Sequence, residues 1–295
     1  MPIKRSLSDR ITDGINLFLL LLLSLVMLFP FYYITAVSFS SFQEFMNTDL
    51  LLFPKRWVLD AYRFIFESKE FIRSIGVTVF ITIVGSIVSL LLTSTMAFAL
   101  IRKLWGQRFY LFLVLFTFIF GAGMIPTYLV VKATGLIDSY WSLIIPDAIS
   151  AFNLIVMRQF FLSIPEELHE AAVIDGANDL QIYTRVILPL SKPALAAFGL
   201  FYAVGQWNTY FTAILYLNDP TKWTVQVILR QIVILDDTTN TLASAAREAA
   251  RSAHLPPPET IQMAAIILAT IPILIVYPFL QKHFAKGVML GSVKG

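Results

Sequence analysis

The chain has 295 residues, of which 57% are hydrophobic and only 14% are charged, and its formal net charge is +3. Too little polar surface is available to cover a soluble globule, so this composition predicts an all-α, polytopic membrane protein. The small net charge argues against a basic nucleic-acid patch, and the lack of cysteine excludes disulfides, thiolate metal sites and thiol catalysis.

Charge-free windows predict six transmembrane helices, because a bilayer core needs about 20 apolar residues in helical conformation. Asp147 and Arg158 interrupt the fourth window and would have to face protein or water. The first window follows basic residues as in a signal peptide, but its apolar run is too long for one, so we expect a retained span. The spans are expected at about residues 15–37, 73–101, 109–131, 141–163, 193–217 and 261–281, in one membrane domain covering residues 1–295.

The lysine and arginine residues predict the orientation. They collect in the turn at residues 102–108 and in the C-terminal tail, where no acidic residue accompanies them. Because such residues mark the cytoplasmic side, both termini, this turn and the loop 164–192 are expected inside, and the segments 38–70 and 218–260 outside. The second external segment contains TLASAAREAARSAH, whose alanine content predicts a helix ending before the following prolines.

The loop 164–192 is unusually polar for this chain and predicts a helix-turn-helix. Ser163 and Glu166 have the spacing of a capping box, and Gly176 can take the left-handed conformation that ends a helix. Asn178 or Asp179 can cap the second helix, with Gln181 completing a capping box if Asn178 is the cap, and Pro189 limits the far end. From the residues alone, a solvated amphipathic hairpin and a docking site for a cytoplasmic protein both remain open.

Motifs for catalysis are missing from the sequence. No phosphate-binding loop of the form GxxxxGK[ST] occurs, and no GxSxG nucleophile elbow occurs. His169, His254 and His283 are far apart, which argues against a metal cluster. We therefore expect no enzyme activity and no cofactor bound by this chain.

The stretch EAAVIDGANDLQIYTRVILP resembles the EAA motif of bacterial ATP-binding-cassette importer permeases. The motif requires Glu-Ala-Ala, three residues, a glycine, nine residues, an aliphatic residue, one more residue and then Leu-Pro. Val186 stands in the usual isoleucine position. Trp207 with Asn208, the stretch NLIVMRQFFLSIPEELHEAA and the terminal KGVMLGSVKG resemble the carbohydrate-type, maltose-like branch. The residues that this resemblance implies for contact with the ATPase are Glu167, Glu170, Ala171, Ala172, Asp175, Gly176, Leu188 and Pro189.

The resemblance also implies partners and location. The chain would be one permease of a bacterial cytoplasmic-membrane importer, surrounded by membrane lipid and paired with a second, homologous permease as a heterodimer. Two ATP-binding-cassette ATPase subunits would bind ATP and Mg, and an extracytoplasmic solute-binding protein would deliver a carbohydrate. Nucleic acid is not an expected partner. The terminal KGVMLGSVKG would lie against the ATPase dimer.

The fifth predicted span carries the candidate residues for a sugar pathway. An indole ring can stack on a sugar, and amides can exchange hydrogen bonds with its hydroxyls. Helix packing is the alternative role for such side chains in membranes. The candidates are Gln206, Trp207, Asn208 and Tyr210, with Asn153 on the fourth span.

Two charged residues of the fourth span are expected to find separate partners. Asp147 and Arg158 are expected on one helix about 16 Å apart, which is too far for an ion pair between them. We expect Arg158 to reach the headgroups and Asp147 to lie near the outer mouth.

Two other functions fit parts of the sequence. An ion-coupled secondary transporter could use helices broken at Pro126, Pro272 or Pro278, but Asp147 is the one clear intramembrane carboxylate. A non-transporting membrane scaffold would explain the docking hairpin and leave the polar residues inside the spans unexplained.

Overall fold

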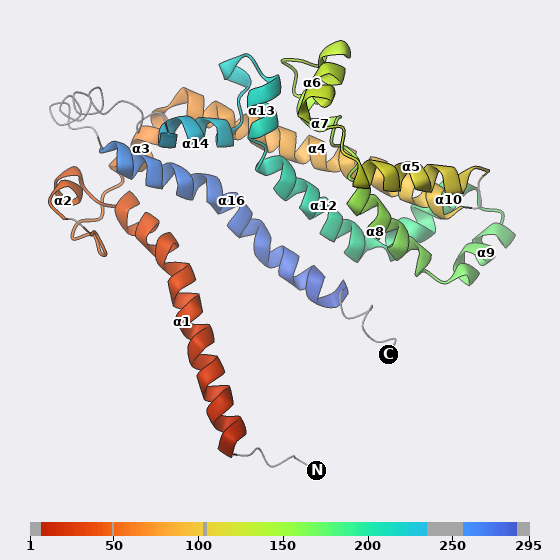
Figure 1. Cartoon of the computed structure of the whole chain (residues 1–295), viewed down its shortest axis with the longest axis horizontal. Coiled ribbons are helices and arrows are strands. Elements are labelled where there is room, and N and C mark those ends of the chain that lie inside the picture. The colour runs from red at the N-terminus through yellow and green to blue at the C-terminus, as the bar shows by residue number, and fades with distance from the viewer. Residues whose placement is uncertain (1–6, 49, 103–104, 235–255, 288–295) are drawn as a thin grey trace. The chain divides into compact units, whose positions relative to one another are not determined.

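The computed structural model describes residues 7–48, 50–102, 105–234 and 256–287, and these residues contain helices and no β-strand. The alanine-rich helix expected within 218–260 and most of the expected ATPase-contacting tail lie outside the described residues. The chain divides into two units, labelled by element in Figure 1: residues 1–68 with 229–270, and residues 69–228 with 271–295.

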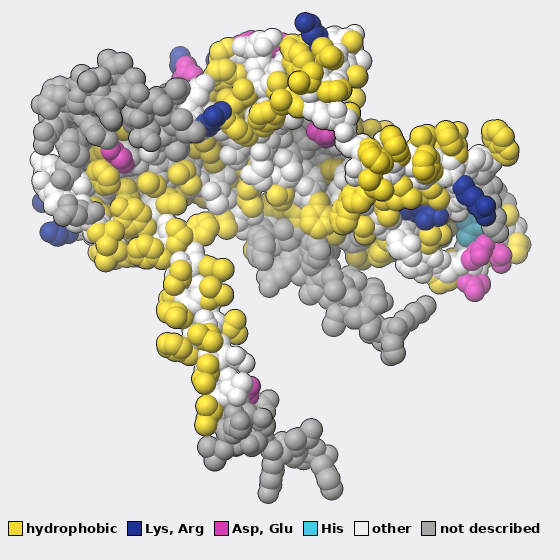
Figure 2. All heavy atoms as spheres, in the orientation of Figure 1, with side chains coloured by type: hydrophobic (Ala, Val, Ile, Leu, Met, Phe, Trp, Pro, Cys, Tyr) yellow, Lys and Arg dark blue, Asp and Glu magenta, His cyan; other side chains and the backbone are white. Residues whose placement is uncertain are grey.

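The first unit contains the long helix α1 (Leu7–Ser38), two short helices and the beginning of α16 (Pro258–Gly287). The short helices are α2 (Phe42–Met46) and α3 (Asp60–Glu67). Its core forms where Ala36 and Val37 at the end of α1 meet Leu51 and Met263. Most of α1 is exposed and apolar, as Figure 2 shows by its hydrophobic side chains, which suits a surface facing lipid or another protein.

The second unit is built around α4 (Lys69–Ile101), which contacts α7, α8 and α12. Small and hydroxyl side chains at Ser74, Thr78, Ser89 and Thr93 are buried along α4. Ser74 and Thr78 are about one helical turn apart, and so are Ser89 and Thr93, and such small side chains let neighbouring helices approach closely. The other helices of this unit are α5 (Gln107–Ile119), α6 (Met124–Ala133), α7 (Trp141–Ile144), α8 (Ala151–Leu162), α9 (Glu166–Ile174), α10 (Asp179–Ile182), the π-helix η1 (Tyr183–Ile187), α11 (Leu188–Leu190), α12 (Lys192–Trp207), α13 (Phe211–Tyr216) and the 3-10 helix η2 (Pro220–Lys222). Helix α14 (Val225–Ile234) is divided between the two units after Ile228.

Three described helices are long and apolar enough to cross a membrane: Ile11–Ser38, Lys69–Ile101 and Pro258–Val276. They coincide with the first, second and sixth predicted spans. Two bent helix pairs, α5 with α6 and the helical run from α10 to α11 with α12, would raise the number to five if each pair crosses once, and α8 is a shorter apolar helix. The protein is therefore an all-helical membrane protein, and the count of six spans stays a prediction.

The third and fourth predicted spans are not continuous helices. The chain bends by 119° between helices α5 and α6. The segment that joins them contains Gly121 and Gly123 and is followed by Pro126. In the fourth span, α7 ends at Ile144 and α8 starts only at Ala151. Pro146 lies in this gap and cannot donate a helical hydrogen bond.

This gap corrects the expectation that Asp147 and Arg158 lie on one helix. The two residues do not share one helix, because Asp147 is exposed in the connection before α8. The Nε of Arg158 donates to the carbonyl oxygen of Leu100 at 3.1 Å, so this side chain binds the end of α4. Gln107 donates to the same oxygen at 2.7 Å. The carbonyl groups at a helix C-terminus lack partners within the helix, which explains why two donors gather there.

The fifth predicted span also contains a break. Helix α12 ends at Trp207 and α13 begins at Phe211. Asn208 follows α12 as its C-cap, with its backbone N–H bonded to Val204. Two of the predicted pathway residues, Asn208 and Tyr210, therefore lie in an interrupted segment and not on a continuous helix.

Candidate functional site

The loop 164–192 forms the expected helix-turn-helix, which we name the hairpin (residues 164–190). Helix α9 ends at Ile174, and Gly176 has a φ of +79°. The N–H of Gly176 donates to Val173 and that of Ala177 donates to Ala172, which is the paired bonding of a Schellman motif. Because the turn needs a left-handed residue, the position of the glycine is explained by local backbone geometry.

The second helix of the hairpin starts with the predicted capping box. The side chain of Asn178 accepts from the N–H of Gln181 at 2.9 Å, and the side chain of Gln181 accepts from the N–H of Asn178 at 2.9 Å. Of the two possible caps that the sequence leaves open, Asn178 and Asp179, the structure has Asn178. The two reciprocal bonds satisfy N–H groups that a helix start otherwise leaves free.

The capping box predicted for the first helix is wrong. Helix α9 begins at Glu166 with Pro165 as its N-cap and without any side-chain capping bond. The hydroxyl of Ser163 instead donates to the carbonyl oxygen of Phe160 at 2.6 Å, at the end of α8. Proline disfavours helical geometry in the residue that precedes it, which here is Ile164. The chain therefore leaves one helix at Ser163 and enters the next only after Pro165.

The outer surface of the hairpin is both acidic and apolar. No residue of α9 is buried, and its acidic side chains, with Asp175, are exposed. Ile174 is 85% exposed and Leu180 is 69% exposed, although both are large apolar side chains. Figure 2 shows acidic side chains gathered over α9. Exposed apolar residues next to charges are typical of a protein-binding surface.

The inner side of the hairpin is attached to α4. Asp179 forms an ion pair with Arg102 at 2.6 Å, and the buried hydroxyl of Tyr183 lies 2.7 Å from the Oγ of Ser94. The ring of Tyr183 also contacts that of Phe98, with centroids 5.3 Å apart. Nothing in the sequence pattern singles out Tyr183 or Ser94, because a hydrogen bond across so many residues depends on how the helices pack.

The other coupling candidates are distributed over both sides of the hairpin. Ala172 and Leu188 are partly buried against the main apolar cluster, whereas Ala171 and Pro189 are exposed. Pro189 follows the π-helical segment η1, in which the N–H of Leu188 bonds to Tyr183. Proline cannot donate to the carbonyl four residues earlier, and π-helical bonding shifts the register before it.

The pathway candidates do not form one cluster. Gln206 is 8% exposed, and among the described residues no hydrogen-bond partner reaches its Oε1. Its amide lies against Gly85 of α4, where an added Cβ would come within 2.9 Å of the Gln206 Cδ. The side chain of Asn208 bonds to its own helix, at Val204. Asn153 lies apart, partly buried in the first turn of α8.

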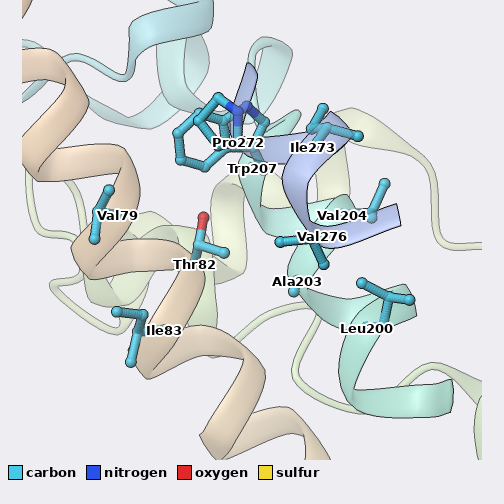
Figure 3. A pocket seen from close by; sticks show the side chains of 10 residues that line it. All are labelled: Val79, Thr82, Ile83, Leu200, Ala203, Val204, Trp207, Pro272, Ile273 and Val276. Atoms are coloured by element: carbon cyan, nitrogen blue, oxygen red, sulfur yellow. The ribbon is translucent and has the colours of Figure 1, made fainter. Parts of the chain in front are cut away.

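A cavity of about 190 Å³ lies beside the end of α12 within the second unit (Figure 3). Of the five pathway candidates it includes only Trp207, and Thr82 is its one lining residue with a hydroxyl. The walls are otherwise apolar and come from α4, α12 and α16. The lining residues are Val79, Thr82, Ile83, Leu200, Ala203, Val204, Trp207, Pro272, Ile273 and Val276.

Asp138 and Lys222 form a second polar cluster that the sequence does not predict. Asp138 has a φ of 59°, and its carboxylate accepts from Lys222 Nζ at 2.6 Å. The same carboxylate accepts from the N–H groups of Asn218 and Asp219, each at 3.0 Å. These bonds, led by that from Lys222, lower the pKa of Asp138, and the bond to Asp138 raises the pKa of Lys222. The cluster joins the connection after α6 to that after α13.

The family model for the binding-protein-dependent transport system inner membrane component matches residues 4–290. The chain belongs to this family. The EAA motif at Glu170 is characteristic of the family. The family consists of ABC transporter permease subunits, which are not themselves catalytic, and places this permease in an inner membrane with several spans.

The permease resembles a curated relative and two solved structures. It is 50% identical over 290 residues to the polygalacturonan/rhamnogalacturonan transport system permease protein YtcP of Bacillus subtilis (strain 168), covering 98% of this chain and 100% of that protein. It is 37% identical, with a TM-score of 0.88, to a chain of a bacterial ABC transporter involved in the import of the acidic polysaccharide alginate, covering 96% and 99% of the two chains.

The second structure is a bacterial alginate ABC transporter in complex with an alginate pentasaccharide-bound periplasmic protein. Its matching chain is 17% identical with a TM-score of 0.53, covering 94% of this chain and 96% of that one. At this identity the likeness shows the fold alone.

Proposed function

We propose that this permease imports oligosaccharides that contain uronic acids, delivered by an extracytoplasmic binding protein. The substrates of the relatives support this substrate class, because polygalacturonan and alginate are both acidic polysaccharides. The binding protein is supported by the family description and by the complex with a periplasmic protein. The geometry of the hairpin supports the proposed coupling to an ATPase.

The hairpin carries the proposal for coupling. Its outer face exposes acidic residues together with Ile174 and Leu180, while its inner face is held to α4 by Asp179 and Tyr183. A solvated surface loop has no need of large exposed apolar side chains. We infer that an ATPase subunit covers this face, with Glu167, Glu170, Ala171 and Asp175 toward the partner; Ala172, Gly176, Leu188 and Pro189 shape the hairpin that presents them.

The remaining assembly follows from the same proposal. A second, homologous permease completes the pathway as a heterodimer, and two ATPase subunits bind ATP and Mg. The permease crosses the membrane six times with both termini and the hairpin in the cytoplasm. Gln206, Trp207, Asn208, Tyr210 and Asn153 are proposed to contact sugar when the pathway opens.

Uptake experiments in cells test the proposal. A strain lacking this permease should fail to take up a tritium-labelled oligogalacturonide, and wild-type protein should restore uptake. Depletion of ATP should stop uptake. An uncoupler that is applied while the ATP level is maintained should leave uptake unchanged. Uptake that stops with the uncoupler and survives loss of ATP would instead identify an ion-coupled transporter. Equal uptake with and without the permease would contradict a transport role for this substrate.

A further inference from the structure

The chain bends sharply between the hairpin and α12. The bend between the helical run Asp179–Leu190 and helix α12 is 85°. Ser191 lies at this bend, and its side chain is fully buried. Pro189 and Pro193 stand on either side of Ser191. Neither proline can donate a backbone hydrogen bond, so the bend cannot straighten into one regular helix without leaving further carbonyl groups unpaired.

A buried tyrosine on each side of the bend bonds to α4. Tyr183, on the hairpin side, lies 2.7 Å from the Oγ of Ser94. Tyr202, on α12, lies 2.6 Å from the Oγ1 of Thr93. All four side chains are buried. Thr93 and Ser94 are consecutive and therefore point about 100° apart around the helix, which lets one turn of α4 hold both arms of the bend.

The hydroxyl groups have consistent donor and acceptor roles. Ser94 also donates to the carbonyl oxygen of Leu91, so its single proton is used and Tyr183 donates to it. The hydroxyl of Tyr202 also accepts from the N–H of Ser150 at 3.4 Å, and either hydroxyl of the pair Tyr202 and Thr93 can donate in the bond between them. Each tyrosine thus completes a small network in which no proton is required twice.

We propose that Tyr183 and Tyr202, with Ser94 and Thr93, form a hydroxyl clamp that makes the hairpin, α4 and α12 move as one body. This inference rests on the proposed function, in which an ATPase moves the hairpin. Apolar packing alone lets helices slide and rotate, whereas a buried hydrogen bond has one short distance and a preferred direction. The clamp therefore carries a displacement of the hairpin past the bend to the end of α12, where Gln206 and Trp207 lie. These four are positioning residues and do not contact substrate.

Conservative substitutions separate the hydroxyl groups from the packing. Tyr183→Phe and Tyr202→Phe keep the rings, and Thr93→Val keeps the side-chain volume while Thr93→Ser keeps the hydroxyl. Tyr62→Phe is the matched control, because it removes a buried tyrosine–serine bond of 2.8 Å, to Ser38, in the other unit. The complete importer is reconstituted in liposomes with its binding protein, and transport of tritium-labelled oligogalacturonide is divided by the ATP hydrolysed.

Tyr183→Phe, Tyr202→Phe and Thr93→Val should each lower transport per ATP by about two- to tenfold, as expected for the loss of one net hydrogen bond. Thr93→Ser and Tyr62→Phe should keep the wild-type ratio. Combining Tyr183→Phe with Ser94→Ala should lower the ratio no further than either change alone, because both remove the same bond. Basal ATP hydrolysis and the melting temperature report whether each complex is intact.

Wild-type ratios in Tyr183→Phe and Tyr202→Phe would overturn the clamp, and so would an equal loss in Tyr62→Phe or an additive loss in the double variant. Failure of the proposed function has a different signature. In that case the wild-type complex itself would not transport the oligogalacturonide.

Discussion

Replacing Gly176 tests whether the turn of the hairpin presents a docking surface. Its φ of +79° lies in the left-handed region, and nothing lies within 4 Å of a Cβ built at this position. A substitution therefore meets no steric obstacle from neighbours, and its cost comes from the backbone alone. An L-residue in this conformation costs about 1–2 kcal/mol, of which about 0.4–1 kcal/mol is recovered because the unfolded chain loses freedom.

Gly176→Ala should therefore cost about 1 kcal/mol, Gly176→Asn less, and Gly176→Val more, because a β-branched residue is least tolerant of positive φ. No residue of α9 is buried, so little packing holds the first helix against this strain. The strain should appear as local opening of the hairpin and not as global unfolding. If the closed hairpin is only marginally stable, a cost of about 1 kcal/mol lowers the population of the hairpin that can dock. Docking of the ATPase should then be about fivefold weaker.

The loop after α6 offers a matched control. Gly135 has a φ of +72° and also has nothing within 4 Å of an added Cβ. Gly135→Ala should carry the same backbone cost without affecting the hairpin. The measurement is the amount of ATPase subunit retained on membranes containing each variant, as a function of ATPase concentration, together with oligogalacturonide uptake.

Retention should fall in the order wild type, Asn, Ala, Val at position 176 and should not change for Gly135→Ala. Wild-type retention and uptake in Gly176→Val would show that the hairpin does not need its observed turn. A loss in Gly135→Ala as large as that in Gly176→Ala would show that general destabilisation explains the effect. Either result would refute the docking argument.

Three further predictions follow from individual side chains. Glu170→Ala should abolish uptake and release the ATPase while the permease stays in the membrane. The reason is that losing one member of a buried charge pair costs about 2–5 kcal/mol, whereas losing one member of an exposed pair costs under about 1 kcal/mol. Near-normal ATPase retention would place Glu170 on a solvated face. Asp138→Asn should lower the melting temperature at neutral pH. Since the pKa of Asp138 is lowered in the folded state, its carboxylate stabilises the fold above the ordinary aspartate pKa of about 3.9, and this stabilisation is lost as the pH falls through the folded pKa. The melting temperatures of the variant and the wild type should therefore converge in acid. A difference in melting temperature that stays constant down to that pH range would contradict the role of the carboxylate. Gln206→Leu should keep or raise the melting temperature, because the Oε1 of Gln206 has no partner within the described structure, yet it should lower uptake if the amide contacts sugar; unchanged uptake would leave Gln206 with a packing role only.

The sequence by itself determined the features that depend on composition and on near neighbours. Hydrophobic content placed the chain in a membrane, and the first, second and sixth apolar windows correspond to long helices. The turn at Gly176 and the capping box of Asn178 and Gln181 were predictable because each is closed by hydrogen bonds within a few residues. The motif at Glu170 was recognisable for the same reason, since its spacing lies within one short segment.

Only the tertiary structure decided where helices break and which distant side chains meet. The hydropathy of an apolar window depends on its residues and not on the direction of the helix axis. The helix breaks after Ile119, Ile144 and Trp207 therefore left no trace in the hydropathy that predicted those spans. The bond of Arg158 to Leu100 depends on a second helix ending beside it. The pairings of Tyr183 with Ser94 and Tyr202 with Thr93 depend likewise on how α4 packs, because a tyrosine has the same sequence signature whether its hydroxyl meets water, lipid or another helix.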